Sequence, residues 1–212
     1  MAEDFGHGTP GSEAYQPTAF AFDAESEAEA AAQIAKYPPG RQASAVIPLL
    51  YIAQRQMRRQ TGSAWVPRAA MDAVARRLGM APIRVYEVAT FYSMFNLAPI
   101  GTWHLQICTT TPCWLRGSDE VVRACRAATG IKAWGETSAD GKFTMSEVEC
   151  LGACVNAPMV QIWKDTYEDL TPDSFGKVLD GFATGQPPKP GPQNGRQFSA
   201  PMGGPTTLKE NT

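Results

Sequence analysis

The first half of the chain carries apolar residues at helical spacing, in short stretches that proline and glycine separate. Residues 24–36 favour a helix, which Pro38-Pro39-Gly40 would end. The pattern then predicts a helix from the N-cap Ser44 to about Gln60, one from Pro67 to Gly79, and one that begins at Pro82. Helices this short are marginal alone in water, so we expect them to pack together as a small bundle.

The last of these helices has apolar residues at positions i, i+3, i+4 and i+7, which are Val85, Val88, Ala89 and Tyr92. Residues at this spacing share one face of a helix. The pattern therefore predicts that the helix runs through Tyr92 and that Phe91 and Tyr92 belong to the core of the bundle.

After Pro99-Ile100-Gly101 the pattern changes to the alternation of apolar and polar residues that is typical of strands. Trp103, Leu105 and Ile107 alternate in a predicted strand that ends at Cys108. Further strands are expected at 142–149, 158–163 and around 165–168, and helices from the cap Ser118 to about Ala128 and from the cap Thr171 through Leu179. The predicted order β-α-β-β-α around one small sheet indicates an α/β domain at about residues 101–184.

The two ends of the chain have a different composition. Residues 1–20 consist mainly of Gly, Pro, Ser and acidic residues without periodicity, and the residues from Gly185 onward are polar and rich in proline and glycine. Neither segment can bury a core, so we expect both to be disordered. The predicted fold class is α+β, with a disordered N-terminus at 1–20, a helical bundle at 21–100, an α/β domain at 101–184 and a flexible tail at 185–212.

A length of 212 residues and a hydrophobic content of 43% allow a buried core, and a net charge of −2 gives no indication of nucleic-acid binding. The longest apolar stretch, residues 45–53, is too short to span a bilayer and contains Pro48, so we expect no direct membrane insertion. No basic residue precedes Lys36, although secretory signals and mitochondrial presequences need one. We therefore expect an intracellular protein whose thiols stay reduced.

The charges are unevenly distributed along the chain. Eight arginines and a single acidic residue, Asp72, lie between Arg41 and Arg84, whereas the first 30 residues contain seven acidic residues and no basic ones. Two interpretations remain open: the basic helices dock onto an acidic partner, or they only present solvated helix faces.

Four of the five cysteines lie in two close pairs, Cys108 with Cys113 and Cys150 with Cys154. The spacing is C-x4-C, a gap of 36 residues, and C-x3-C, so two short loops could converge on one site with four thiolates. Such a site holds a zinc ion or an iron–sulfur cluster, and the third alternative is four thiols that bind no metal. The wider loops favour a two-iron cluster, because structural zinc sites prefer C-x2-C pairs. The absence of a C-x2-C redox motif argues against a dithiol oxidoreductase.

Other residues have less specific interpretations. Cys125 is predicted to be a buried free thiol, since its neighbours at helical spacing are apolar. His104 is expected to be either exposed or satisfied by a hydrogen bond, Trp114 either shields the cysteine site or packs in the core, and Pro158 is either cis or trans. No G-x-G-x-x-G or Walker loop occurs, so nucleotide binding by this chain is unsupported.

The segments 85–120, which begins VYEVATFY, and 140–163, which contains ECLGACV, closely resemble the small two-iron subunit of the NADH dehydrogenase module of respiratory complex I, NADH:ubiquinone oxidoreductase. The resemblance extends from about Phe20 to about Gly185. It implies tight association with the flavoprotein subunit that binds FMN and NADH, and with further iron–sulfur subunits. It also implies a thioredoxin-like ferredoxin domain that holds one 2Fe–2S cluster through four ligands, Cys108, Cys113, Cys150 and Cys154.

The same resemblance implies an electron-transfer subunit whose cluster exchanges single electrons with FMN on the partner. The isolated chain is then not expected to oxidise NADH. The complex would be peripheral on the cytoplasmic face of a bacterial inner membrane, or on the matrix side if the chain is a mature mitochondrial form. Two alternatives stay open: the equivalent diaphorase subunit of an NAD-reducing hydrogenase or NAD-linked formate dehydrogenase, and a zinc-stabilised interaction module that binds acidic protein or nucleic acid.

Overall fold

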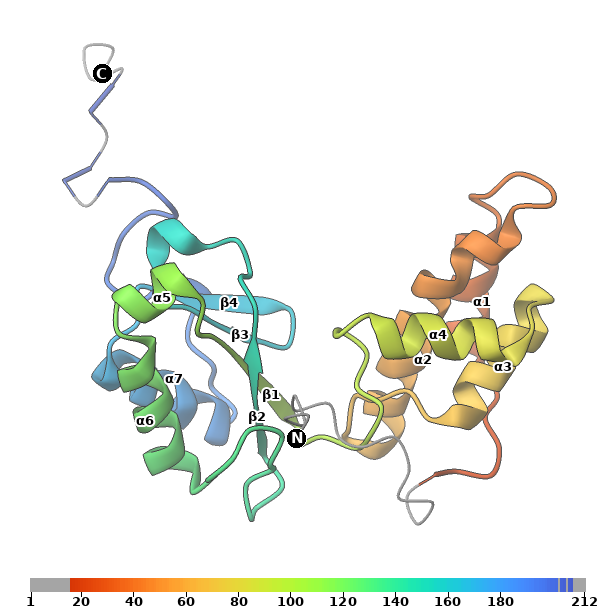
Figure 1. Ribbon diagram of the computed structural model, residues 1–212, viewed down its shortest axis with the longest axis horizontal. Coiled ribbons are helices and arrows are strands. Elements are labelled where there is room, and N and C mark those ends of the chain that lie inside the picture. Colours follow the sequence, from red (N-terminus) through yellow and green to blue (C-terminus); the bar gives the residue numbers. More distant parts are fainter. Residues whose placement is uncertain (1–15, 202, 205, 208–212) are drawn as a thin grey trace. The chain divides into compact units, whose positions relative to one another are not determined.

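The computed structural model describes residues 16–201, 203–204 and 206–207, so the expectation of disorder at residues 1–15 lies outside its range. The chain divides into two compact units, with the boundary between Thr102 and Trp103. As described, the first unit contains helices and the second contains a five-stranded sheet with helices, which agrees with the predicted fold class (Figure 1). No helix within the described ranges is both long and apolar enough to cross a membrane.

The helical unit packs its helices around one apolar core, as the periodicity predicts. Five of its fully buried positions come from three different helices and one connection: Leu49, Leu50, Val66, Val74 and Val85. The bounds of the elements are Ala24–Ile34 (α1), Gln42–Ala45 (the 3-10 turn η2), Val46–Thr61 (α2), Arg68–Leu78 (α3) and Pro82–Phe91 (α4).

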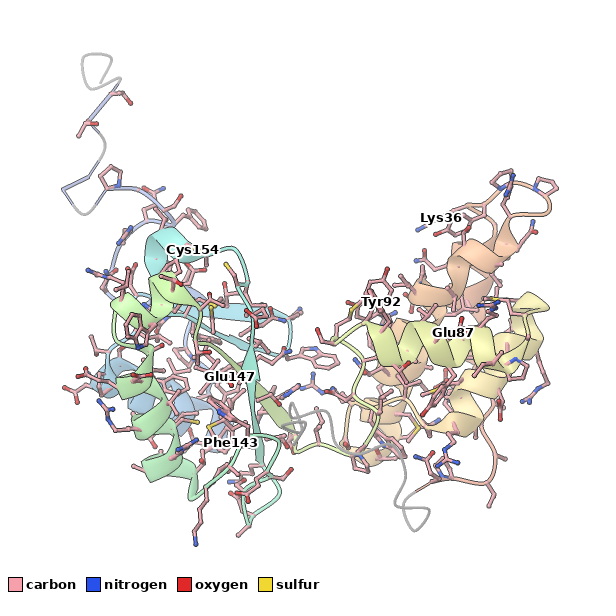
Figure 2. All side chains as sticks on the ribbon, in the orientation of Figure 1. Lys36, Glu87, Tyr92, Phe143, Glu147 and Cys154 are labelled. Carbon is pink, nitrogen blue, oxygen red and sulfur yellow. The ribbon has the colours of Figure 1, made fainter. Side chains whose placement is uncertain are left out.

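Two local predictions about the helical unit are wrong. Ser44 does not cap α2, because it lies inside η2 and the helix begins after Ala45. Tyr92, labelled in Figure 2, does not continue α4: its backbone is extended (φ −91°, ψ 114°) and the residue is 38% exposed. Phe91 is 79% exposed, and Phe95 packs in the core instead. Because α4 ends at Phe91, position i+7 lies beyond the helix and no longer shares its apolar face.

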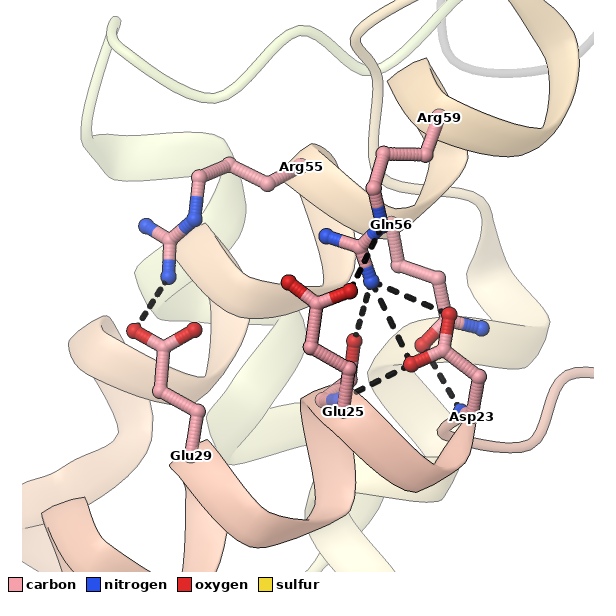
Figure 3. A network of polar contacts seen from close by, with 7 residues as sticks. Asp23, Glu25, Glu29, Arg55, Gln56 and Arg59 are labelled. Carbon is pink, nitrogen blue, oxygen red and sulfur yellow. Dashed lines mark hydrogen bonds and ion pairs between the residues drawn. The ribbon is translucent and has the colours of Figure 1, made fainter.

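Arginines of α2 and α3 form ion pairs with acidic residues at and around α1. Figure 3 shows Arg55 and Arg59 directed at these carboxylates. Part of the basic run noted in the sequence is therefore neutralised within this unit. Each pair is about half exposed, so its own contribution to stability is only about 0–1 kcal/mol. The N···O distances are 2.6 Å for Arg55–Glu29, 3.0 Å for Arg59–Asp23 and 2.8 Å for Arg77–Glu27.

Two buried glutamines of α2 bind irregular segments that flank the helices. Gln56 is 1% exposed; its Nε2 donates to Ala21 O at 2.8 Å, and its Oε1 accepts from Asp23 N at 3.0 Å. Gln54 is 4% exposed; its Nε2 donates to Met94 O, and its Oε1 accepts from Asn96 N. These side chains supply the partners that buried backbone groups outside regular structure require.

Residues 16–20, which we expected to be disordered, contact the helical unit. Gln16 Oε1 accepts from Arg68 N at 2.9 Å. Phe20 packs against the core and against Phe22, with ring centroids 5.4 Å apart. Burial of an aromatic ring offsets the entropy lost when the segment is ordered, so Phe20 is the residue that makes the expectation wrong here.

The second unit is built on a sheet with the strand order β2-β1-β3-β4-β5. Its strands are Trp103–Cys108 (β1), Phe143–Val148 (β2), Val160–Ile162 (β3), Asp165–Glu168 (β4) and Gly191–Pro192 (β5). The β1–β2 and β4–β5 pairs are parallel, and the β1–β3 and β3–β4 pairs are antiparallel. The chain reverses at the Asp140-Gly141 turn, where Thr137 and Thr144 form an antiparallel bridge and Ser138 N donates to Phe143 O at 2.7 Å. Beyond this turn, β2 also pairs with β1.

The two faces of β1 have different environments. Leu105 and Ile107 share an apolar core with the helices α6 (Ser118–Thr129) and α7 (Pro172–Ala183), which pack against each other. His104 alternates with them and is also buried, with its Nε2 2.8 Å from Ser146 Oγ of β2. The expectation that this histidine is satisfied by a hydrogen bond is therefore confirmed.

One of the two predicted helix caps in this unit is present. Thr171 Oγ1 accepts from Ser174 N at 3.1 Å and begins α7 with a capping box. Ser118 does not cap α6. The N-cap is Gly117, in the left-handed conformation, and Ser118 is fully buried inside the first turn. The helix begins one residue earlier than the sequence pattern indicates.

The C-terminal segment has defined structure where we expected a flexible tail. β5 pairs with the edge strand β4, and Tyr167 Oη donates to Pro188 O at 3.1 Å. Gly181 permits this path, because a Cβ at this position would lie 2.8 Å from Gln186 O. The expectation for 185–212 is therefore wrong for residues 186–193. A segment rich in proline and glycine needs no core of its own when a sheet edge satisfies its backbone.

Replacement of Gln56 with alanine should destabilise the helical unit by about 1–3 kcal/mol, because Ala21 O and Asp23 N would lose their buried partners. Urea unfolding of the full chain, followed by circular dichroism at the helix band, measures the effect. Gln60→Ala, on the exposed side of the same helix, is the matched control and should change the free energy of unfolding by at most about 0.5 kcal/mol. Equal losses in the two variants would contradict this role of Gln56.

Candidate metal centre

The parallel pairing of β1 with β2 brings both cysteine loops to one edge of the sheet. Cys108, the last residue of β1, lies opposite Val148, the last residue of β2, and Cys150 follows shortly after. The carboxyl ends of parallel strands lie at the same edge of a sheet. Cys113 lies in the short helix α5 (Thr111–Leu115) after β1, and Cys154 begins the 3-10 turn η3 (Cys154–Asn156) after β2 (Figure 1).

The first pair, Cys108 and Cys113, is buried, with 1% of each residue exposed. Cys108 Sγ lies 3.2 Å from Thr110 Oγ1. Burial raises the pKa of the Cys113 thiol to about 12, and a hydrogen bond with Cys108 acts in the same direction. Without a metal, Cys113 is therefore a protonated thiol at neutral pH.

The second pair, Cys150 and Cys154, is exposed, and its two Sγ atoms lie 3.1 Å apart (Cys154 is labelled in Figure 2). Gly152 makes the turn between them with a φ of 87°, which favours glycine. The hydrogen bond with Cys154 lowers the pKa of Cys150, and the backbone of Gly152 acts in the same direction. The same contact raises the pKa of Cys154, so Cys150 is the thiol of this pair that loses its proton more readily.

The four thiols are arranged as two linked pairs. The Thr110 hydroxyl contacts Cys108 and also hydrogen-bonds with Cys150, so it joins the two loops. Within the described part of the chain, no three His, Cys, Asp or Glu side chains gather closely enough to hold one metal ion. A two-iron cluster takes two thiolates on each iron, whereas zinc needs its thiolates about 2.3 Å from one point. The paired arrangement therefore matches the donor set of a two-iron cluster.

Three other residues with open interpretations lie outside this donor set. Cys125 is fully buried in the core beneath α6, where desolvation raises its pKa to about 12; this confirms the predicted buried thiol. Trp114 is 57% exposed, so the core-packing alternative is wrong. The Ala157–Pro158 peptide bond is cis.

Sequence reasoning missed an apolar surface beside the cysteines. Leu115 and Val155 are 71% and 65% exposed, and together with Trp114 they form what we call the apolar rim. The rim residues directly follow Cys113 and Cys154 in the chain. Exposed apolar residues that lie together with a functional site are typical of an interaction surface.

Residues 30–183 match the family of the thioredoxin-like [2Fe-2S] ferredoxin, and this match covers well over half of the chain. The chain belongs to this family. Its membership confirms the expected cofactor, one 2Fe–2S cluster, and the predicted fold of the second unit.

Relatives of known identity are similar over most of the chain. The NADH-quinone oxidoreductase subunit named E 1 of Rhizobium meliloti (strain 1021) is 51% identical over 197 residues, which cover 92% of this chain and 69% of that protein. The NADH-quinone oxidoreductase subunit named E of Rickettsia conorii (strain ATCC VR-613 / Malish 7) is 54% identical over 163 residues, 77% of this chain and 94% of the relative.

A solved structure of an NAD+-reducing [NiFe]-hydrogenase in the air-oxidised state has a similar fold. The TM-score is 0.56 with 17% identity, over 68% of this chain and 23% of the hydrogenase chain. An identity this low supports the fold alone.

In the chain freed of metal, Cys150 should be the first cysteine that iodoacetamide alkylates as the pH rises. Its pKa lies below the usual cysteine value of 9.0, so its thiolate forms at a lower pH than that of an ordinary cysteine. Cys113 and Cys125 should react slowest up to pH 9, because their thiols stay protonated until about pH 12. Mass spectrometry of peptides after short pulses of iodoacetamide at several pH values gives the order. Modification of Cys113 at the rate of Cys150 would contradict the assigned shifts.

Proposed function

We propose that this chain is the 2Fe–2S electron-transfer subunit of a respiratory NADH-quinone oxidoreductase. The observation that carries the proposal is a pair of thiol loops at one sheet edge, in a chain 51–54% identical to bacterial subunits of that enzyme. The chain would act as part of the enzyme complex and not as an enzyme by itself.

The proposed ligands are the four cysteines of the two loops. When bound, a 2Fe–2S cluster supplies a one-electron redox centre. The chain places hydrogen-bond donors toward the ligand sulfurs: the Thr110 hydroxyl and the backbone of Gly152 for Cys150, and the backbone of Met159 for Cys113. Donors of this kind stabilise negative charge on sulfur and so favour the reduced state. The complete proposed set is Cys108, Cys113, Cys150 and Cys154.

The proposed partner is the flavoprotein subunit that binds FMN and NADH. NADH gives up a hydride, which carries two electrons, so a flavin must stand between NADH and a one-electron centre. The sequence of this chain contains no glycine-rich phosphate loop that would bind either cofactor. The apolar rim supports docking next to the cysteines, because contact there would remove exposed apolar surface from water. The arginine-rich helices are a weaker candidate surface, since the acidic residues near α1 already pair with part of their charge.

The proposed location is peripheral, on the cytoplasmic face of a bacterial inner membrane or the matrix side of the mitochondrial one, held there by the other subunits. The diaphorase subunit of an NAD-reducing hydrogenase is the second candidate, with which the similar hydrogenase fold is consistent. Purification of the native complex and identification of its subunits by mass spectrometry separates the two: a nickel–iron subunit would overturn the respiratory assignment.

Serine in place of Cys108, Cys113, Cys150 or Cys154 should abolish or strongly reduce the bound cluster, because each substitution removes a thiolate ligand. Cys125→Ser is the matched control and should retain the wild-type content of iron and acid-labile sulfide. Chemical analysis with the visible absorption spectrum provides the measurement. Bound zinc, with no visible bands in the wild type, would favour the interaction module instead.

The isolated chain with its cluster should bleach with dithionite and stay oxidised with NADH. Visible absorption under anaerobic conditions follows both reactions. Addition of the purified flavoprotein subunit should then make NADH effective. Turnover of NADH by the single chain, free of flavin and with an artificial acceptor, would show that the chain itself handles the hydride.

A further inference from the structure

A C-terminal strap, which we define as residues 191–198, lies outside the family match at 30–183 and packs on the turn that carries Cys154. Its first residues form β5 on the edge of β4. The chain then passes η3, where Phe198 O accepts from Asn156 Nδ2 at 3.0 Å. The strap therefore contacts the candidate metal centre through a residue two positions after a proposed ligand.

Asn156 is the point at which the turn is attached to the rest of the unit. It is 3% exposed, and its backbone O accepts from Asp169 N at 2.7 Å. Its side-chain Nδ2 donates to Glu168 and to Phe198 O, and its Oδ1 accepts from Arg196 Nη1 at 3.0 Å. These bonds hold the end of η3 between β4 and the strap, although Cys154 itself is exposed.

Arg196 joins three parts of this arrangement. Its Nη1 contacts Asn156 Oδ1 and also Val155 O at 3.4 Å, while Nη2 lies 2.9 Å from Asp169 Oδ1. In the ion pair between Arg196 and Asp169, the two side chains are 11% and 4% exposed. This ion pair is therefore buried, unlike the half-exposed ion pairs of the helical unit. A buried ion pair adds little net stability to a fold. Separation of its two side chains is nevertheless costly, because it leaves each charge buried with neither a partner nor water, so the pair holds both side chains in place. The planar guanidinium bonds several acceptors at fixed angles, which a lysine ammonium does not reproduce.

We propose that Arg196 is a positioning residue, through which the strap holds the Cys154 turn in the geometry in which its thiolate binds iron. The inference rests on the proposed function for the identity of the metal group. The position of Cys154 relative to Cys150 depends on the backbone of this exposed turn, and Arg196 bonds that backbone at Val155 O. Residues that orient ligands without touching the metal change metal affinity by about 10–100-fold when replaced.

The test compares the full chain with Arg196→Gln, Arg196→Lys and the exposed control Arg123→Gln, which makes the same change of charge on α6. Each protein, purified with its cluster, is mixed with an excess of an iron chelator, and the loss of visible absorption gives the rate of iron release. Arg196→Gln should release iron about 10-fold faster or more, Arg196→Lys at an intermediate rate, and Arg123→Gln at the wild-type rate. Wild-type release from Arg196→Gln would overturn the proposal.

A second readout separates positioning from loss of the domain. In the metal-free chain, Arg196→Gln should change the alkylation rate of Cys154 and leave buried Cys125 protected. If Cys125 becomes reactive together with Cys154, the arginine only maintains the fold and the proposal is overturned.

The double variant Asp169→Asn with Arg196→Met leaves no unpaired buried charge, so it should fold, and it should still release iron faster than the wild type. Because alkylation needs no cluster, it tests the strap even if the wild type binds zinc and the proposed function fails.

Discussion

The parallel pairing of β1 with β2 is the constraint on which the rest of the cluster domain depends. A shift of one residue would turn every side chain of the strand to the opposite face of the sheet. The register is enforced because the two faces of β1 differ: Leu105 and Ile107 enter the apolar core, while His104 meets Ser146 on the other face. The core beneath α6 and α7 therefore determines where the two cysteine loops lie, although most loop residues take no part in it.

The helical unit is held together in another way. Its core is apolar, but the segments around the core are fixed by polar groups: carboxylates near α1 paired with arginines, and the amides of Gln54 and Gln56 bonded to backbone. The acidic residues at 23–29 and part of the arginine-rich helices thus belong to one arrangement. An acidic segment of the same chain is therefore the partner of part of the basic run.

Much of the fold and the candidate site could be predicted from periodicity and spacing. The longer helices, four of the five strands, the Thr171 cap and the two cysteine loops follow from local patterns, because each depends on neighbours within a few residues. The short helix α5, which carries Cys113, was not predicted. Features decided by distant contacts could not be predicted: the end of α4 before Tyr92, the parallel partner of β2, and β5. Gly191–Pro192 has no preference for a strand, and pairs only because β4 presents an open edge. The bonds of Arg196 to η3 have no sequence signal for the same reason.

The order of synthesis gives the strap a further significance. A ribosome makes the four cysteines and all five strands of the sheet before it reaches Arg196. Domains generally fold as units and from the N-terminal side during synthesis, so a nascent chain can gather its thiols while η3 still lacks its last anchor. Maturation of the metal centre is then a two-stage event. The thiols are assembled first, and the turn that carries one of them gains its last anchor only after Arg196 has emerged from the ribosome.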